Sequence, residues 1–270
     1  MLVRMNYLSE ILEEEVFLNV ILPEPRVLGI NEADAPLREK LPVLYLLHGY
    51  HGGASDWQRK TSIEQFMHEA QKHMIIVTPG MNNFFYTNMV HGKRYFDFVA
   101  DELPRVIQTY FNASDRREDT FVAGLSMGGY GAMKLALTYP ERYGYAASFS
   151  GAVDCFNQKD LSEIQDPKML AMRLAMQDEL NWIFGPEERR RGSKNDVMAL
   201  LETCDPAKAP KLYASCGLDD DLYEGNVAFR DKARALGYDL TFYEQPATGH
   251  EWRFWNTEAE KLIKQYLPIK

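Results

Sequence analysis

The chain is poor in the residues that build disulfide-rich and metal-binding proteins. Its 270 residues contain three cysteines, at positions 155, 204 and 216, and neither a Cys-x-x-Cys nor a His-Glu-x-x-His motif. An odd, widely spaced set of cysteines indicates reduced thiols, which is typical of a cytoplasmic protein. His48 and His51 bracket a Gly-Tyr turn instead of sharing a helical face, so we expect no metal site.

Positive charge and long apolar runs are also scarce. Lys and Arg number 30 against 39 Asp and Glu, which gives a formal net charge of −9 and a pI near 5.3. That balance argues against a nucleic-acid partner, because binding nucleic acid needs a basic stripe. No run approaches 18 apolar residues, and residues 1–7 lack the apolar core of a secretory signal. We therefore expect neither membrane insertion nor secretion.

Material for an α/β core, in contrast, is plentiful: 46% of the residues are hydrophobic and 12% are aromatic. Alternating residues predict an antiparallel hairpin within 2–22, and the prolines of 24–41 predict a surface loop. Further strands are expected at 43–47, 74–80, 120–124, 144–150, 211–216 and 239–244. Helices are expected at 62–72, 94–111 (with a kink or break at Pro104), 127–139, 224–236 and 251–266. Strands that alternate with helices predict an α/β fold with a mainly parallel sheet, here in a single domain over 1–270.

The alternation lapses between about 151 and 207, a length unlike that of a structureless loop. Residues 161–179 have helical composition, and 195–201 predict a second helix. The methionines at 169, 172 and 176 recur at helical spacing, which is more typical of packing than of a cofactor site. Because this insertion follows a strand at the carboxyl edge of the sheet, where ligands bind, we interpret it as a cap-like insertion.

The most informative motif is Gly-Leu-Ser-Met-Gly at 124–128, preceded by a buried-strand pattern and followed by a helical one. Gly-x-Ser-x-Gly in this context is typical of a nucleophile elbow, a sharp turn that holds the serine hydroxyl above the sheet. Glycines suit such a turn because they leave room beside the nucleophile and adopt strained dihedrals cheaply. The alternative is a glycine-rich turn that binds a phosphate, or nothing. The motif predicts Ser126 as a nucleophile.

A serine nucleophile needs a histidine to take its proton and an acid to orient that histidine, in the chain order Ser, acid, His. Of the six histidines only His250 follows Ser126, in a loop between the last strand and the last helix. An exposed loop histidine without a role is the alternative. The acid is expected after the penultimate strand, where Asp219, Asp220 and Asp221 are adjacent and spacing does not choose among them. A calcium-binding acidic turn is the alternative there.

An oxyanion hole needs two backbone N–H groups aimed at the carbonyl oxygen of the substrate. The amide of Met127, directly after the nucleophile, is expected to supply one. The amide of Tyr50, in the loop after the buried strand 43–47, is expected to supply the other. Chemistry of this kind requires no metal and no organic cofactor.

Several segments together resemble the esterase D family, closest to its tributyrin-esterase-type bacterial carboxylesterases, which are related to feruloyl and acetyl esterases. They are His-Gly-Tyr-His-Gly-Gly at 48–53, Ser-Asp-Trp at 55–57, Tyr-Thr-Asn-Met at 86–89 and Gly-Leu-Ser-Met-Gly-Gly-Tyr-Gly-Ala at 124–132. The resemblance extends over about residues 10–265. It implies an α/β-hydrolase fold with a mainly parallel eight-stranded sheet and a short cap. The family's Gly-x-x-Asp pattern selects Asp220 as the acid.

The resemblance also implies a serine carboxylesterase for short-chain acyl esters, including acetylated or feruloylated carbohydrates. His51, Trp57, Tyr86 and Trp182 are candidates for lining the substrate pocket, with plain packing as the alternative for each. An S-formylglutathione hydrolase is a second interpretation, although the threonine–cysteine pair of those enzymes is replaced here by residues 50–53. A catalytically silent binding protein on the same fold is a third. The expected partner is a small ester, and the oligomeric state is left open, a homo-oligomer included.

Overall fold

The structure is a computed structural model that describes residues 1–24, 40–157 and 167–269. Its strands are β1 (Leu2–Ser9), β2 (Glu14–Ile21), β3 (Val43–Leu47), β4 (Ile75–Pro79), β5 (Thr120–Leu125), β6 (Tyr145–Phe149), β7 (Lys211–Gly217) and β8 (Leu240–Gln245). They form one eight-stranded sheet in the order β1-β2-β4-β3-β5-β6-β7-β8. The six strands from β4 to β8 are parallel, and β1 and β2 form an antiparallel hairpin at one edge. Both the predicted hairpin and the mainly parallel sheet are confirmed.

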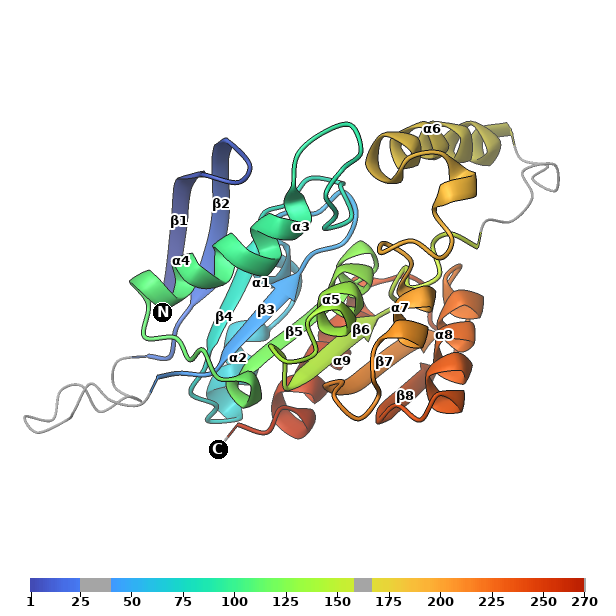
Figure 1. Ribbon diagram of the computed structural model, residues 1–270. Helices are drawn as coiled ribbons and strands as arrows, with labels where there is room; N and C mark the ends of the chain where they lie inside the picture. The colour runs from blue at the N-terminus through green and yellow to red at the C-terminus, as the bar shows by residue number, and fades with distance from the viewer. Residues whose placement is uncertain (25–39, 158–166, 270) are drawn as a thin grey trace, which may run out of the picture.

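The helices lie on both faces of this sheet (Figure 1). They are α1 (Asp56–Lys60), α2 (Ile63–Glu69), α3 (Tyr95–Asp97), α4 (Leu103–Tyr110), α5 (Met127–Thr138), α6 (Pro167–Phe184), α7 (Val197–Thr203), α8 (Tyr223–Ala235) and α9 (Trp252–Lys261). Short helical turns occur at Phe98–Glu102, Arg117–Asp119, Glu187–Arg189 and Leu262–Tyr266. α1 was not predicted, and α6 extends beyond the predicted range, whereas the other observed helices lie close to the predicted ones. The predicted loop at 24–41 and the first part of the predicted helix at 161–179 fall largely outside the described residues.

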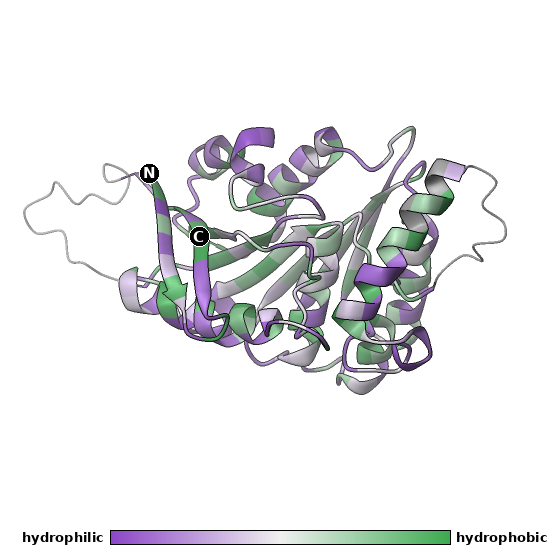
Figure 2. Cartoon of the chain, turned by 90° about the horizontal axis from the view of Figure 1, so that it is seen from above, coloured by the Kyte–Doolittle hydropathy of each residue, from purple (hydrophilic) through white to green (hydrophobic). Residues whose placement is uncertain are grey.

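Strand side chains alternate between two hydrophobic cores. Val43, Tyr45 and Leu47 of β3 join a cluster with α4, α5, α7 and α8, while Leu44 and Leu46 join a second cluster with α1, α2 and α9. β3, β4 and β6 are buried at every position, as expected of parallel strands covered on both faces. Figure 2 shows apolar colour along these central strands. Successive side chains of a strand therefore face opposite helix layers.

The predicted helix at 94–111 is present as one continuous helical segment, in which the helix type changes from α to π and back to α. After α3 the residues Phe98–Glu102 form a π-helical turn, and α4 follows with Pro104 at its start. Proline has no N–H to donate and its ring crowds the carbonyl four residues earlier, so the turn before it widens. The break predicted at Pro104 is therefore present as a π-helical turn.

The region between β6 and β7 divides into two parts. α7 packs against α5 and α8 within the helix layer, so it belongs to the body of the fold. α6 lies beyond the carboxyl edge of the sheet (Figure 1), where the cap was expected. Met176 packs partly buried against the core, whereas the side chains of Met169 and Met172 lie outside the described part of the chain. Of the predicted insertion at 151–207, α6 therefore lies beyond the edge of the sheet, whereas α7 is part of the helix layer.

Candidate active site

Ser126 occupies a strained turn between β5 and α5. Its backbone has φ +54° and ψ −119°, in a region that residues with side chains rarely adopt. Hydrogen bonds on both sides hold it there: its N–H donates to the carbonyl of Phe149 (2.9 Å), and its carbonyl accepts from the N–H of Ala152 (3.0 Å). This is the geometry expected of a nucleophile elbow.

The two flanking glycines let this turn pack against neighbouring backbone. A Cβ placed on Gly124 would lie 2.4 Å from the carbonyl carbon of Gly128, and one on Gly128 would lie 2.5 Å from the carbonyl oxygen of Leu47. Real Cβ atoms do not approach backbone this closely. The glycine spacing is therefore a steric requirement of the elbow, as the sequence motif predicts.

The structure brings Ser126, His250 and Asp220 together. His250 Nε2 lies 3.0 Å from Ser126 Oγ, and His250 Nδ1 lies 2.9 Å from Asp220 Oδ2. The imidazole therefore contacts a hydroxyl on one side and a carboxylate on the other. In this arrangement Nε2 can accept the hydroxyl proton while Nδ1–H donates to the carboxylate.

Of the three adjacent aspartates, only Asp220 faces the histidine. Asp219 and Asp221 are exposed, whereas Asp220 is buried and its second oxygen accepts the N–H of Leu222 at 2.9 Å. Burial opposes ionisation of this carboxyl, but hydrogen bonds from His250 and Leu222 outweigh it and hold the pKa of Asp220 below its usual value. Asp220 is therefore ionised near neutral pH, as an acid that orients an imidazole must be.

The loop after β7, which carries Asp220 (the acid loop), and the loop after β8, which carries His250 (the histidine loop), lie side by side because β7 and β8 are parallel neighbours. The N–H of Asp219 donates to the carbonyl of Thr248 at 2.9 Å. A Cβ on Gly217 would lie 2.1 Å from that same carbonyl oxygen, so the two loops touch. Asn226, fully buried on α8, donates to the carbonyls of Gly151 and Leu222 at 2.9 and 2.8 Å. These bonds tie the acid loop to the segment after β6.

The loop after β3 lies directly beside the nucleophile. A Cβ on Gly49 would lie 3.3 Å from Ser126 Cβ. The amide of Tyr50 follows at once, and no hydrogen bond among the described residues uses that amide as a donor. The amide of Met127 opens α5, and amides of a first helical turn have no partner within the helix. Both amides predicted for the oxyanion hole thus lie close to Ser126. Met127 is the next residue in the chain, and Tyr50 follows Gly49, which lies against Ser126.

Two of the predicted pocket residues are core residues. Trp57 has no exposed surface, packs between Phe149 and Trp252, and donates its indole N–H to the carbonyl of Leu47 at 3.1 Å. Tyr86 is 1% exposed and its hydroxyl donates to the carbonyl of His48 at 2.9 Å. Packing, the alternative for each residue, therefore accounts for both side chains.

The other two predicted pocket residues are exposed. His51 has a left-handed backbone (φ +59°), and the centroid of its ring lies 4.4 Å from that of Tyr50. Trp182, on α6, is 61% exposed, and its ring meets that of His91 edge to face, with the ring centroids 5.5 Å apart. α6 reaches the site instead through Glu179, whose carboxylate accepts a hydrogen bond from the Tyr50 hydroxyl.

Sequence reasoning missed the side chains of His48, Glu179 and Asn226. Each acts through a contact with a segment distant in the sequence, and no local pattern marks such a contact. The sequence marks His48 as part of the motif at 48–53 and as one of a pair of histidines without metal-binding spacing, but gives its side chain no role. Its ring is in fact buried and hydrogen-bonded within the loop beside Ser126.

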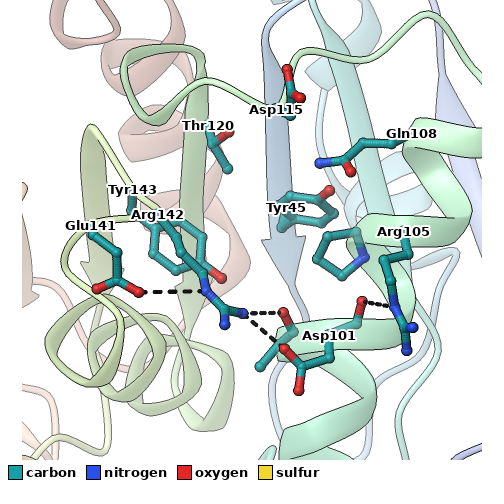
Figure 3. A pocket seen from close by; sticks show the side chains of 11 residues that line it. Tyr45, Asp101, Arg105, Gln108, Asp115, Thr120, Glu141, Arg142 and Tyr143 are labelled. Atoms are coloured by element: carbon teal, nitrogen blue, oxygen red, sulfur yellow. Dashed lines mark hydrogen bonds and ion pairs between the residues drawn. The ribbon is translucent and has the colours of Figure 1, made fainter.

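A cavity of about 540 Å³ lies elsewhere, near the amino ends of β5 and β6 (Figure 3). Its walls include Tyr45, Asp101, Arg142 and Tyr143, and none of the predicted site residues. We do not assign the chemistry to it, because the nucleophile lies at the opposite edge of the sheet. Within the described ranges, no cluster of three His, Cys, Asp or Glu side chains is arranged to hold a metal ion. No helix there is long and apolar enough to span a membrane.

A mostly parallel sheet between two helix layers, with a serine at a strained strand–helix turn, defines an α/β-hydrolase. Residues 9–264 match the model of the Esterase family, described as "Putative esterase". An acetyl esterase of Caldicellulosiruptor saccharolyticus is 30% identical over 260 residues, which cover 94% of each chain.

Two solved structures from Staphylococcus aureus are similar throughout. The fluorophosphonate-binding serine hydrolase FphF has a TM-score of 0.82 and 28% identity, covering 97% of this chain and 96% of its own. The S-formylglutathione hydrolase FrmB has a TM-score of 0.80 and 28% identity, covering 97% of both chains. The chain belongs to the Esterase family, and it is a serine hydrolase of carboxylic esters.

Proposed function

We propose that Ser126, His250 and Asp220 form a catalytic triad that hydrolyses short-chain acyl esters. The observation that carries this proposal is the position of the His250 ring, which contacts Ser126 Oγ at 3.0 Å and Asp220 Oδ2 at 2.9 Å. A hydroxyl is a weak nucleophile at neutral pH, and a base within hydrogen-bond distance is what activates it.

The reaction proceeds through an acyl-enzyme. Ser126 Oγ attacks the acyl carbonyl carbon while its proton passes to His250 Nε2. The amides of Tyr50 and Met127 bind the oxyanion, and the ionised Asp220 stabilises the imidazolium. The alcohol leaves with the proton from His250. Water, deprotonated by the same ring, then attacks the acyl-enzyme, and the acid departs as Ser126 regains its proton.

The acyl group is proposed to be short, such as acetyl or butyryl, and the alcohol to be a carbohydrate in the natural substrate. Similarity to an acetyl esterase over 94% of the chain supports an acetyl donor. Similarity to the S-formylglutathione hydrolase FrmB supports a thioester as the second candidate. The two are distinguished by their turnover of p-nitrophenyl acetate and of S-formylglutathione.

The experiment compares p-nitrophenyl esters of C2 to C12 acids in the wild type and in three separate variants, Asp219→Asn, Asp220→Asn and Asp221→Asn. We expect highest kcat/KM for C2–C4 esters and a loss of about 10⁴ in kcat for Asp220→Asn only, because an amide at that position favours the wrong imidazole tautomer. Asp219→Asn and Asp221→Asn are matched controls with exposed side chains. Ser126→Ala should lose about 10⁶.

Other outcomes would redirect the assignment. Sensitivity at Asp219 or Asp221 would move the acid along the chain. A wild type that turns over only the glutathione thioester would replace ester hydrolysis by thioester hydrolysis. A protein that neither hydrolyses esters nor reacts with a serine-directed phosphonate would have a binding role.

A further inference from the structure

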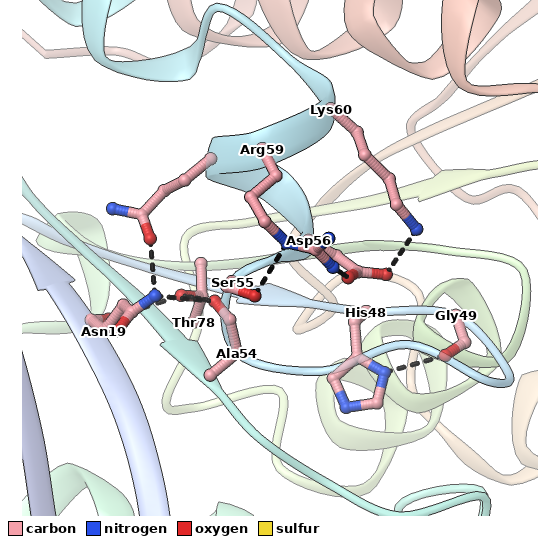
Figure 4. Close-up of polar contacts among 10 residues, drawn as sticks. Asn19, His48, Gly49, Ala54, Ser55, Asp56, Arg59, Lys60 and Thr78 are labelled. Atoms are coloured by element: carbon pink, nitrogen blue, oxygen red, sulfur yellow. Dashed lines mark hydrogen bonds and ion pairs between the residues drawn. The ribbon is translucent and has the colours of Figure 1, made fainter.

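His48 lies directly after β3, in the loop beside the nucleophile, and its ring is buried. Figure 4 shows the ring turned toward the carbonyl oxygen of Gly49. Nδ1 is 2.7 Å from the carbonyl oxygen of Gly49. Nε2 is 2.8 Å from the N–H of Met81, which comes from the loop after β4. Both ring nitrogens are therefore engaged by backbone, and the ring joins two loops at the carboxyl edge of the sheet.

These two partners determine the tautomer of His48. An amide N–H only donates, so Nε2 is the unprotonated nitrogen that accepts from Met81. The proton is then on Nδ1, which donates to the Gly49 carbonyl. Burial lowers the pKa of His48, which agrees with a neutral ring. The nearby carboxylate of Asp56 is already paired with Arg59 at 2.7 Å and Lys60 at 2.9 Å.

The bond to Gly49 orients the following amide, because Gly49 C=O and Tyr50 N–H belong to one planar trans peptide and point in opposite directions. The same carbonyl also accepts the N–H of Gly52 at 3.1 Å. Two donors thus hold the carbonyl on one side, and the Tyr50 N–H is left facing the other. Gly49 lies against Ser126, since a Cβ placed on Gly49 would lie 3.3 Å from Ser126 Cβ.

We propose that His48 is a positioning residue, whose Nδ1–H holds the Gly49–Tyr50 peptide so that the Tyr50 amide points at the developing oxyanion. This inference rests on the proposed esterase function and on Tyr50 as an oxyanion donor. Preorganised donors stabilise the charge that develops in the transition state, so a misaligned Tyr50 amide reduces kcat more than it raises KM.

Substitution of His48 by asparagine or glutamine tests the roles of its two ring nitrogens separately. In His48→Asn an amide N–H lies at the position of Nδ1 and restores the donor to Gly49. In His48→Gln the polar group lies at the position of Nε2, where it serves Met81 but not Gly49. His48→Ala removes both bonds. The same Asn and Gln substitutions at His68, an exposed residue of α2, are the matched controls.

The experiment measures kcat, KM and the inhibition constant of a trifluoromethyl ketone, a transition-state analogue, in these variants and in the wild type. For His48→Gln and His48→Ala we expect kcat to fall about 10- to 100-fold at nearly constant KM, approaching the loss seen when an oxyanion donor is removed. Binding of the ketone should weaken by the same factor. His48→Asn should retain at least about tenfold more kcat than His48→Gln.

A His48→Asn variant no better than His48→Gln would overturn the inference, since the donor to Gly49 would then not be what matters. So would a rise in KM with kcat unchanged, or variants that lose thermal stability but keep both ketone affinity and kcat. The proposed function is tested separately in the same assay. It fails if wild-type protein hydrolyses no ester, and it stands if Ser126→Ala abolishes hydrolysis whatever the His48 variants do.

Discussion

At the scale of single residues, the site depends on how closely backbone segments approach each other. Gly128 touches the end of β3, Gly49 touches Ser126, and Gly217 touches the histidine loop. In each case the missing Cβ is what permits the contact. The positions of the side chains that do chemistry are thus set partly by residues that have no side chain.

We expect Gly128→Ala to impair both activity and stability. The added Cβ would lie 2.5 Å from the carbonyl oxygen of Leu47 and 2.7 Å from that of His48, so the elbow must move away from the loop that carries Tyr50. Overpacking of this kind costs about 1–3 kcal/mol. Denaturant unfolding and p-nitrophenyl acetate turnover measure the two effects.

Gly53→Ala is the matched control, because a Cβ at Gly53 meets nothing within 4 Å. It should change the free energy of unfolding by less than about 0.5 kcal/mol. Equal effects of the two substitutions would mean that the close packing of the elbow is unimportant.

At the scale of elements, α6 is anchored at its carboxyl end. Its last residues, Leu180, Ile183 and Phe184, are buried, and Phe184 packs against the rings of Phe85 and Phe156 at 5.5 and 4.9 Å. Further along its surface, Leu174 and Trp182 are 48% and 61% exposed. The contact of Glu179 with the Tyr50 hydroxyl lies just before the anchored end. The buried residues at the carboxyl end of α6 therefore hold Glu179 near Tyr50.

Phe184→Ala should destabilise the protein by about 3 kcal/mol, since truncating a buried phenylalanine leaves a cavity among the aromatic rings around it. Trp182→Ala, on the same helix but exposed, should change stability by less than about 0.5 kcal/mol. Thermal unfolding of both variants provides the comparison. If Trp182→Ala also raised KM markedly, Trp182 would contact substrate after all.

α5 contains a buried lysine that its sequence pattern does not predict. Its apolar composition predicts a buried helix, but Lys134 is buried within it at 2% exposure. Its amine donates to Thr87 Oγ1 (2.6 Å) and Asn195 Oδ1 (2.8 Å) and lies over the ring of Phe96. Burial lowers the pKa of Lys134 well below its usual value. A buried lysine amine joins three segments here, and helical periodicity does not predict that.

At the scale of the whole molecule, the formal charge of −9 affects which substrates approach easily. We expect kcat/KM for an anionic ester, such as p-nitrophenyl succinate, to rise about two- to tenfold as salt increases from about 0.02 to 0.5 M, because salt screens the repulsion. Values for p-nitrophenyl acetate, which is neutral, should stay nearly constant. A fall in kcat/KM for the anionic ester with salt would indicate a locally positive site. S-formylglutathione has a net negative charge, so its kcat/KM should rise with salt as that of the anionic ester does.

The sequence by itself determined the elements and the chemistry that depend on neighbouring residues. Alternating strands and helices predict the parallel sheet, because burial on two faces leaves a local apolar pattern. The turn at 124–128 is predicted by its own glycines. Chain order selects His250, since it is the sole histidine after Ser126. Each of these inferences uses residues close in sequence, or their order.

Tertiary structure alone decided which side chains meet. Spacing does not choose among the three adjacent aspartates, although the family resemblance selects Asp220. In the structure, with β7 paired to β8, Asp220 contacts His250 while Asp219 and Asp221 face solvent. Trp57 and Tyr86 lie beside site motifs in the sequence yet are buried in the core. The ring of His48 meets Met81 across 33 residues. The physical reason is that burial and hydrogen-bond partners come from segments distant in the chain, which periodicity and local motifs do not report.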